Sequence, residues 1–82
     1  MLHALKTAPK FYDAVKNGGK NFEIRKNDRD FRVGDILELC KYPSATRSHF
    51  IERRVTYILT HEDFPEGVPE GYVVMGMEKT KG

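Results

Sequence analysis

The chain has 82 residues, of which 39% are hydrophobic and 32% are charged, and its formal net charge is +2. This length predicts one domain over residues 1–82 and excludes a large two-lobed enzyme with its own nucleotide domain, while the composition excludes a disordered chain. No apolar run approaches the roughly 18–20 residues that cross a bilayer, and residues 1–10 hold no secretory apolar core, so we expect a cytoplasmic protein with no membrane segment.

The N-terminal part of the chain predicts a short strand followed by a short helix. Residues 3–5 begin the strand, and Pro9 suits the first position of a helix, where no backbone donor is needed. Gly18 and Gly19 end the helix, because glycine adopts the left-handed cap conformation at little cost. The helix is therefore expected over residues 9–17.

After the helix the apolar residues change from the helical spacing to a period of two. Phe22 and Ile24 alternate with Glu23 and Arg25, as in a half-buried strand whose apolar residues face the core. Residues 27–30 (NDRD) carry turn-forming side chains and end this strand.

The second half of the chain predicts three more strands. Residues 36–40 form the first and residues 49–60 the longest, with the polar residues 43–48 as the tip of the hairpin between them. Residues 61–71 contain two prolines and two glycines and predict a loop, and residues 72–77 form a last apolar strand.

The predicted fold is mixed α+β and mostly β, with about five strands and one short helix. Short strands at this spacing, each with one buried face, predict a small barrel or rolled sheet, and closure of the barrel removes exposed strand edges. Arg53 falls on the apolar face of the longest strand, so it either points into a cleft or extends outward to solvent. The predicted core consists of Phe11, Val15, Phe22, Ile24, Leu37, Leu39, Val55, Tyr57, Val73 and Met75.

The segment from Gly18 to Arg25 has the pattern G-x-K-x-x-E-x-R, follows the predicted helix and opens the next strand. The sequence VGD at residues 33–35 and another apolar strand come after it. This arrangement resembles the ASCH domain, named for activating signal cointegrator homology, within the PUA-like barrel superfamily. Residues 22–39 and two later strand segments (RVTYIL and GYVVMG) are similar to a small bacterial and phage branch of ASCH-like domains, so the likeness covers nearly the whole chain.

The resemblance implies a small PUA-like β-barrel with a cleft beside the helix and the motif, and in the family that cleft is proposed to bind RNA or a nucleotide. Some small ASCH-like proteins are amidohydrolases that remove an acyl group from acetylcytidine. Their catalytic lysine corresponds to Lys20, but their catalytic threonine corresponds to Glu23 here, which departs from the pattern of those enzymes. Their further carboxylate lies downstream, where Glu62, Asp63 and Glu66 are nominal candidates.

Lys20, Glu23 and Arg25 are the residues of the motif that carry chemistry. Lys20 follows two glycines, which let a ligand approach the backbone, and it can hold a phosphate or, once desolvated, act as a base or nucleophile. Glu23 and Arg25 share a strand face and can pair, with Glu23 accepting from a nucleobase and Arg25 contacting phosphate or stacking on a base. Strict alternation leaves Lys20 out of phase, so the three converge only if the strand begins after Lys20 or is bulged there. The alternative is three solvated residues, with a surface ion pair worth at most ~1 kcal/mol.

Basic residues are concentrated in the first part of the chain. Residues 1–59 carry 12 basic and 7 acidic side chains, a net of +5, and residues 60–82 carry 2 basic and 5 acidic ones, a net of −3. Such a patch attracts nucleic acid, although interleaved acidic residues also allow a plain solvated surface. The side chains expected to follow an RNA backbone beside the motif are Lys26, Arg29, Arg32, Arg47, Arg53 and Arg54. The aromatic residues that either stack on bases or complete the core are Phe31, Tyr42, Phe50 and Phe64.

Other chemistries find little support in the sequence. His3, His49 and His61 lack the spacing of metal ligands, so we expect no zinc site and no cofactor. Cys40 lies in a strand pattern and is expected to be a small buried hydrophobic residue. As the single cysteine it forms no internal disulfide.

The sequence leaves three hypotheses about function open. The first is a binding module that recognises RNA, or a nucleotide within it, through a cleft lined by Lys20, Glu23 and Arg25. The second is a small amidohydrolase acting on a modified nucleoside, with Lys20 as the reactive group and Glu23 as its acid–base partner. The third is a protein-interaction domain, in which the cleft has no ligand.

Overall fold

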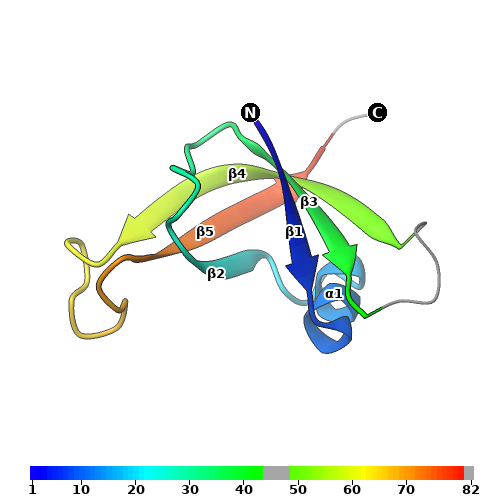
Figure 1. Cartoon of the computed structure of the whole chain (residues 1–82), viewed down its shortest axis with the longest axis horizontal. Coiled ribbons are helices and arrows are strands. Elements are labelled where there is room, and N and C mark those ends of the chain that lie inside the picture. The colour runs from blue at the N-terminus through cyan, green and yellow to red at the C-terminus, as the bar shows by residue number, and fades with distance from the viewer. Residues whose placement is uncertain (44–48, 81–82) are drawn as a thin grey trace.

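A single curled sheet and one helix make up the fold of the computed structural model, which describes residues 1–43 and 49–80 (Figure 1). Within these residues the helix lies against the ends of the first and third strands. The elements are β1 (Leu2–Thr7), α1 (Pro9–Lys16), β2 (Phe22–Lys26), β3 (Ile36–Lys41), β4 (Phe50–Thr60) and β5 (Tyr72–Lys79). The prediction of a mostly β fold with about five strands and one short helix is confirmed, and the predicted loop at 61–71 falls between β4 and β5.

The sheet is a half-barrel, because its strands curl around the core but its two edges do not pair. The strand order is β1-β3-β4-β5-β2, with β1 parallel to β3 and every other neighbouring pair antiparallel. β1 and β2 are therefore the edges of the described sheet, although they follow each other in the chain with only α1 between them. This seam between β1 and β2 is where the sheet leaves room for a site.

α1 forms where the sequence predicts it and ends one residue earlier. Pro9 is its first residue, and after Lys16 the chain turns away at Gly18, whose φ of +84° is a conformation that suits glycine. The helix buries Tyr12 and Val15 against the sheet. Phe11, which the sequence assigned to the core, is instead 48% exposed, because the buried face of this short helix contains Tyr12 and Val15 and not Phe11.

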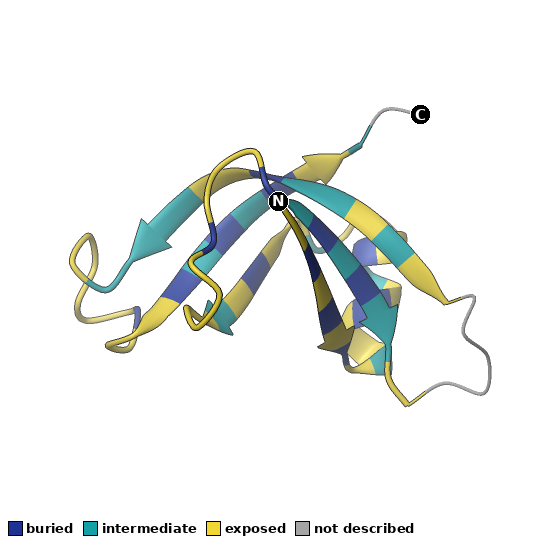
Figure 2. Ribbon diagram, turned by 45° about the horizontal axis from the view of Figure 1, so that its top comes forward, coloured by how far each residue is buried: buried dark blue, intermediate teal, exposed yellow. Residues whose placement is uncertain are grey.

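The core lies on the concave side of the sheet, and along β1 buried and exposed residues alternate (Figure 2). Six predicted core residues are buried there, namely Val15, Leu37, Leu39, Val55, Val73 and Met75. The cluster also includes Leu5, Phe31 and Met77. Strands β3 and β5 supply most of these side chains, and the long strand β4 between them adds Val55 and the partly buried Ile51 and Ile58.

Three strand residues predicted to be buried are exposed. Phe22 and Ile24 lie outside because β2 turns Glu23 inward, which reverses the face that the apolar alternation predicts. Tyr57 is exposed because the register of β4 shifts between Val55 and Tyr57, so that Ile58 packs against the core in its place. Alternation alone does not reveal a bulge or a strand whose polar face is buried.

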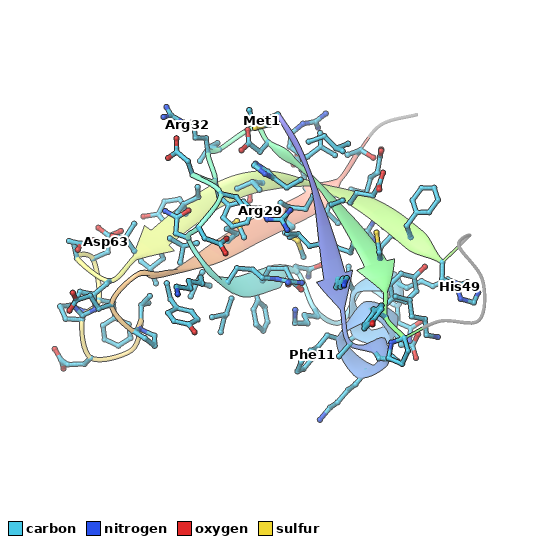
Figure 3. The ribbon with its side chains drawn as sticks, in the orientation of Figure 1. Met1, Phe11, Arg29, Arg32, His49 and Asp63 are labelled. Carbon is cyan, nitrogen blue, oxygen red and sulfur yellow. The ribbon has the colours of Figure 1, made fainter. Side chains whose placement is uncertain are left out.

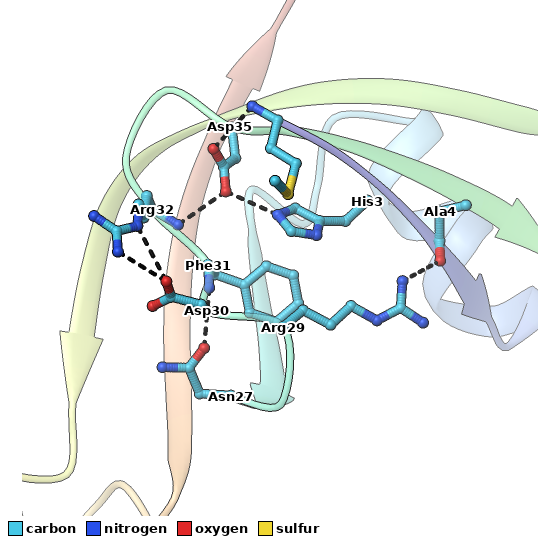
Figure 4. Close-up of polar contacts among 9 residues, drawn as sticks. His3, Ala4, Asn27, Arg29, Asp30, Phe31, Arg32 and Asp35 are labelled. Carbon is cyan, nitrogen blue, oxygen red and sulfur yellow. Dashed lines mark hydrogen bonds and ion pairs between the residues drawn. The ribbon is translucent and has the colours of Figure 1, made fainter.

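A buried polar cluster fixes the loop before β3 to the first strand (Figure 4). The His3 ring and the Asp35 carboxylate are hydrogen-bonded at 2.8 Å, and the backbone N–H of Arg32 donates to the same carboxylate at 3.0 Å. Burial raises the pKa of Asp35, but the hydrogen bonds from His3, from Arg32 and from the Met1 amino group outweigh it and leave this pKa below its ordinary value. The ring of Phe31 meets the His3 ring edge-on at 4.7 Å and closes the cluster on its apolar side.

Candidate functional site

A pocket of about 620 Å³ lies where the end of β1, the helix α1 and the edge strand β2 meet. Its volume is in the range of sites for small organic ligands. The lining residues are Lys6, Thr7, Ala8, Lys10, Phe11, Ala14, Gly19, Lys20, Phe22, Glu23, Ile24 and Arg25. The pocket therefore contains the charged residues of the G-x-K-x-x-E-x-R motif and sits at the seam between β1 and β2.

The three charged residues of the motif converge on the carboxylate of Glu23. Glu23 is only 4% exposed, and its two oxygens accept from different cations: Oε1 from Lys20 Nζ at 2.5 Å and Oε2 from Arg25 Nε at 3.0 Å. Lys20 Nζ also donates to the carbonyl of Phe22 at 2.8 Å. The three side chains could converge if the strand began after Lys20. Because β2 begins at Phe22, Lys20 lies before the strand and its side chain is not bound to the alternating faces of β2.

Arg25 also connects the two edges of the sheet. Its Nη2 donates to the carbonyl of Lys6 at 3.0 Å and to the hydroxyl of Thr7 at 3.2 Å, both at the end of β1. Further along the seam, Arg29 Nη1 donates to the carbonyl of Ala4 at 2.7 Å (Figure 4). Two guanidinium groups thus take backbone acceptors of β1 that a neighbouring strand would otherwise use.

Aromatic rings flank the charged cluster on the pocket side. Lys20 Nζ lies 5.3 Å from the ring centre of Phe11 and 5.1 Å from that of Phe22, and the two residues are 48% and 45% exposed. Figure 3 shows Phe11 projecting from α1 on the side toward β2. The arrangement offers apolar faces beside a buried carboxylate and two cations, which suits a flat, polar-edged ligand.

Most of the other basic residues that the sequence singled out lie away from this pocket and contact other protein groups. Arg32 pairs with Asp30 at 2.8 Å on the surface, and this hydrogen bond raises the pKa of Arg32. Arg53 is half-buried and does not line the pocket, and its guanidinium donates to the carbonyl of Val15 at the end of α1 and to that of Glu52.

The remaining basic candidates do not line the pocket in the described part of the chain. Arg54 is 3.4 Å from the carboxylate of Glu78 on the neighbouring strand. Lys26 is exposed at the end of β2, one residue beyond the pocket-lining Arg25. Arg47 lies outside the described residues.

The aromatic and acidic residues that the sequence singled out beyond the motif also lie outside the pocket. Phe31 belongs to the core, whereas Tyr42, Phe50 and Phe64 are exposed and do not line the pocket. The nominal downstream carboxylates also lie elsewhere: Asp63 accepts from Thr60 within the loop after β4.

Metal and thiol chemistry have little basis in the described part of the chain. Residues 1–43 and 49–80 contain no group of three or more His, Cys, Asp or Glu side chains that could hold a metal ion. Burial raises the pKa of the half-buried Cys40 thiol, and the nearby Glu38 carboxylate adds to the increase. In the described part of the chain the helix α1 is too short and too polar to span a bilayer.

Sequence reasoning missed part of the pocket, namely Lys6, Thr7, Lys10 and Phe11 as lining residues. In the sequence, Lys6 and Thr7 lie only at the junction of the predicted strand and helix, and Lys10 and Phe11 carry only a helix signal. The sequence contains no local sign that the end of β1 and the start of α1 face β2, because that contact arises from the curl of the whole sheet.

Comparison with known proteins identifies the family of this chain and a structure with a similar fold. A curated relative, the "Uncharacterized 12.9 kDa protein in GpA 3'region" of Escherichia phage P2, is 32% identical over 66 residues, which make up 79% of this chain and 61% of that protein. The chain therefore spans about three fifths of that relative's length. The crystal structure of the hypothetical protein PH0355 has a similar fold, with a TM-score of 0.67 at 16% identity over 98% of this chain and all of that one. Residues 2–77 match the domain of unknown function DUF3850, and the chain belongs to that family.

Proposed function

We propose that the pocket binds a nucleotide, as a unit of RNA or on its own, and that this family is a branch of the ASCH and PUA-like domains. Of the G-x-K-x-x-E-x-R motif that carries this resemblance, Gly19, Lys20 and residues 22–25 line the pocket. The resemblance implies a ligand cleft beside the helix, and the pocket has that position.

The observation that carries the proposal is a buried carboxylate, Glu23, held by a lysine whose ammonium lies beside two exposed aromatic rings. Glu23 is anchored by Lys20 and Arg25, so its oxygens and the Lys20 ammonium present a fixed acceptor and donor to the pocket. Phe11 and Phe22 supply faces on which a nucleobase stacks, an interaction worth about 1–3 kcal/mol per base. A carboxylate beside a ring face can then accept from the exocyclic amino group of a base.

The experiment is an amide-shift NMR titration of isotope-labelled protein at low salt, first with a mixed pool of short RNAs and then with single nucleosides and nucleotides. We expect shifts at Gly19 to Arg25 and at the start of α1. Lys20→Ala should weaken binding, whereas the matched change Lys16→Ala, on the exposed end of α1 outside the pocket, should not. If no ligand shifts the pocket amides at low salt, the proposal is wrong.

A second candidate function is hydrolysis of an amide on a modified nucleoside, and the contact between Lys20 and Glu23 favours it. In that reaction Glu23 accepts a proton from water as the water attacks the acyl carbon, and Lys20 donates a proton to the departing amine. The products are a carboxylic acid and the free amine, so no cofactor is required. Glu23 stands where the similar enzymes have threonine, which is why binding is the first proposal.

Acetylcytidine is the substrate that separates the two functions. A hydrolase loses its turnover in Lys20→Ala, whereas a binding module loses part of its affinity and has no turnover to lose. Absence of deacylation by concentrated wild-type protein, in an assay where an enzyme of known activity turns over, would exclude acetylcytidine as a substrate.

A further inference from the structure

We propose that Lys6 and Lys10 form a phosphate subsite on the rim of this pocket, so that its ligand carries a phosphate and is not a neutral nucleoside. The inference rests on the proposed nucleotide-binding function and adds two residues that the motif does not contain. Both residues line the pocket, Lys6 from the end of β1 and Lys10 from the first turn of α1.

The charges in the pocket do not balance. Its lining has four cationic side chains, those of Lys6, Lys10, Lys20 and Arg25, and one carboxylate, that of Glu23. The negative charge of Glu23 is already paired with Lys20 and Arg25. The positive charge of Lys6 and Lys10 therefore has no anionic counterpart among the described residues that line the pocket.

The surroundings of the two lysines leave their ammonium groups available. Lys6 Nζ lies 4.6 Å from the ring centre of Tyr42, a contact that positions a cation without neutralising it. Lys10 is exposed, and within the described residues its side chain makes no hydrogen bond, ion pair or ring contact. A lysine ammonium is a compact, mobile point charge, which suits the oxygens of a phosphate.

The place of the lysines relative to the aromatic rings selects a nucleotide over a simple anion. Lys10 directly precedes Phe11, and Lys6 directly precedes Thr7, whose hydroxyl is bonded to Arg25. The lining therefore combines ring faces and the Glu23 carboxylate, from α1 and β2, with two cations that have no anionic partner, from the end of β1 and the first turn of α1. The start of α1, where Lys10 lies, adds its partial positive charge. A ligand that fills both parts has an aromatic base and an anionic group.

The test compares affinities for a nucleoside, its 5′- and 3′-monophosphates, and inorganic phosphate, measured by NMR titration at one low ionic strength. The better monophosphate should bind about tenfold more tightly than the nucleoside, as expected for a charge-assisted hydrogen bond that is partly exposed to water. The double variant Lys6→Gln/Lys10→Gln should lose this tenfold gain and keep the affinity for the nucleoside. Lys16→Gln on the same helix is the matched control and should keep both.

Each outcome separates this inference from the proposed function. Equal affinities for nucleoside and monophosphate, or an unchanged gain in the double variant, would overturn the subsite and leave nucleoside binding in place. If inorganic phosphate binds as tightly as the nucleotide and depends on both lysines, the phosphate subsite holds and the base pocket fails. If neither nucleosides nor nucleotides shift the pocket amides, both ideas are wrong.

Discussion

Replacing Glu23 by glutamine should destabilise the fold as well as alter the pocket. The carboxylate is almost fully buried, and it fixes Arg25 in the position from which Arg25 reaches the Lys6 carbonyl and the Thr7 hydroxyl on β1. Glutamine keeps the volume of the side chain but has one acceptor where the carboxylate has two. Its amide N–H₂ would face Lys20 or Arg25, both of which are donors.

The size of the effect follows from the two contacts that change. A hydrogen bond to a charged group contributes about 1.5–3 kcal/mol, and Glu23 accepts two of them. The Lys20 and Arg25 side chains are 15% and 25% exposed, so water replaces part of what each one loses. We therefore expect a loss of about 2 kcal/mol in the free energy of unfolding, which lowers the Tm of a domain this small by roughly 10 °C.

Urea unfolding followed by circular dichroism, together with a thermal scan, measures this loss. The control is Glu70→Gln in the exposed turn before β5, which should change the free energy of unfolding by less than about 0.5 kcal/mol. A double-mutant cycle with Arg25→Ala should give a loss smaller than the sum of the single losses, because both variants break the same link. A Glu23→Gln protein as stable as the control would refute the argument that this carboxylate holds the seam.

Three further outcomes test other parts of the structure. The folded state lowers the pKa of Asp35, so the ionised Asp35 carboxylate stabilises the fold fully above its unfolded-state pKa. This stabilisation is lost as the pH falls through the folded-state pKa. The urea midpoint of the wild type should therefore drop in acid, and that of Asp35→Asn should drop less. Because the pKa of Cys40 is raised, iodoacetamide should alkylate it more slowly than free cysteine at pH 8, and comparable rates would contradict its burial. Leu37→Ala, at a fully buried core position, should cost about 2–5 kcal/mol in a urea titration, and a loss below 1 kcal/mol would show that the core can collapse around the change.

The elements could be predicted from the sequence because their limits are set locally. Pro9 and Gly18 mark the two ends of α1, and the proline- and glycine-containing segment 61–71 separates the two longest strands. The motif also fixed the membership of the charged cluster, since all three predicted residues meet at Glu23.

The direction in which β2 faces could not be predicted from its own residues. The alternation of Phe22 and Ile24 with Glu23 assigns the apolar side to the core, as it does correctly for Leu37 and Leu39 in β3. β2 differs because it is an edge strand beside an unpaired seam, where β1 presents carbonyl groups that need donors. Whether a strand borders such a seam depends on the strand order of the whole sheet, which no local pattern contains.

The same reasoning decides where evidence for a ligand must come from. Glu23 and Arg25 join β2 to β1, and this structural role alone accounts for their contacts. A loss of binding in their variants therefore combines a change in the fold with a change in the pocket. Lys10 and Phe11 are different: both are exposed, and within the described residues the Lys10 side chain makes no hydrogen bond, ion pair or ring contact. An exposed phenylalanine and an unpaired lysine that share a pocket add little to folding. Substitutions at these two positions therefore report on the ligand itself: Phe11→Ala should weaken binding of the base, and Lys10→Gln should weaken binding of the phosphate.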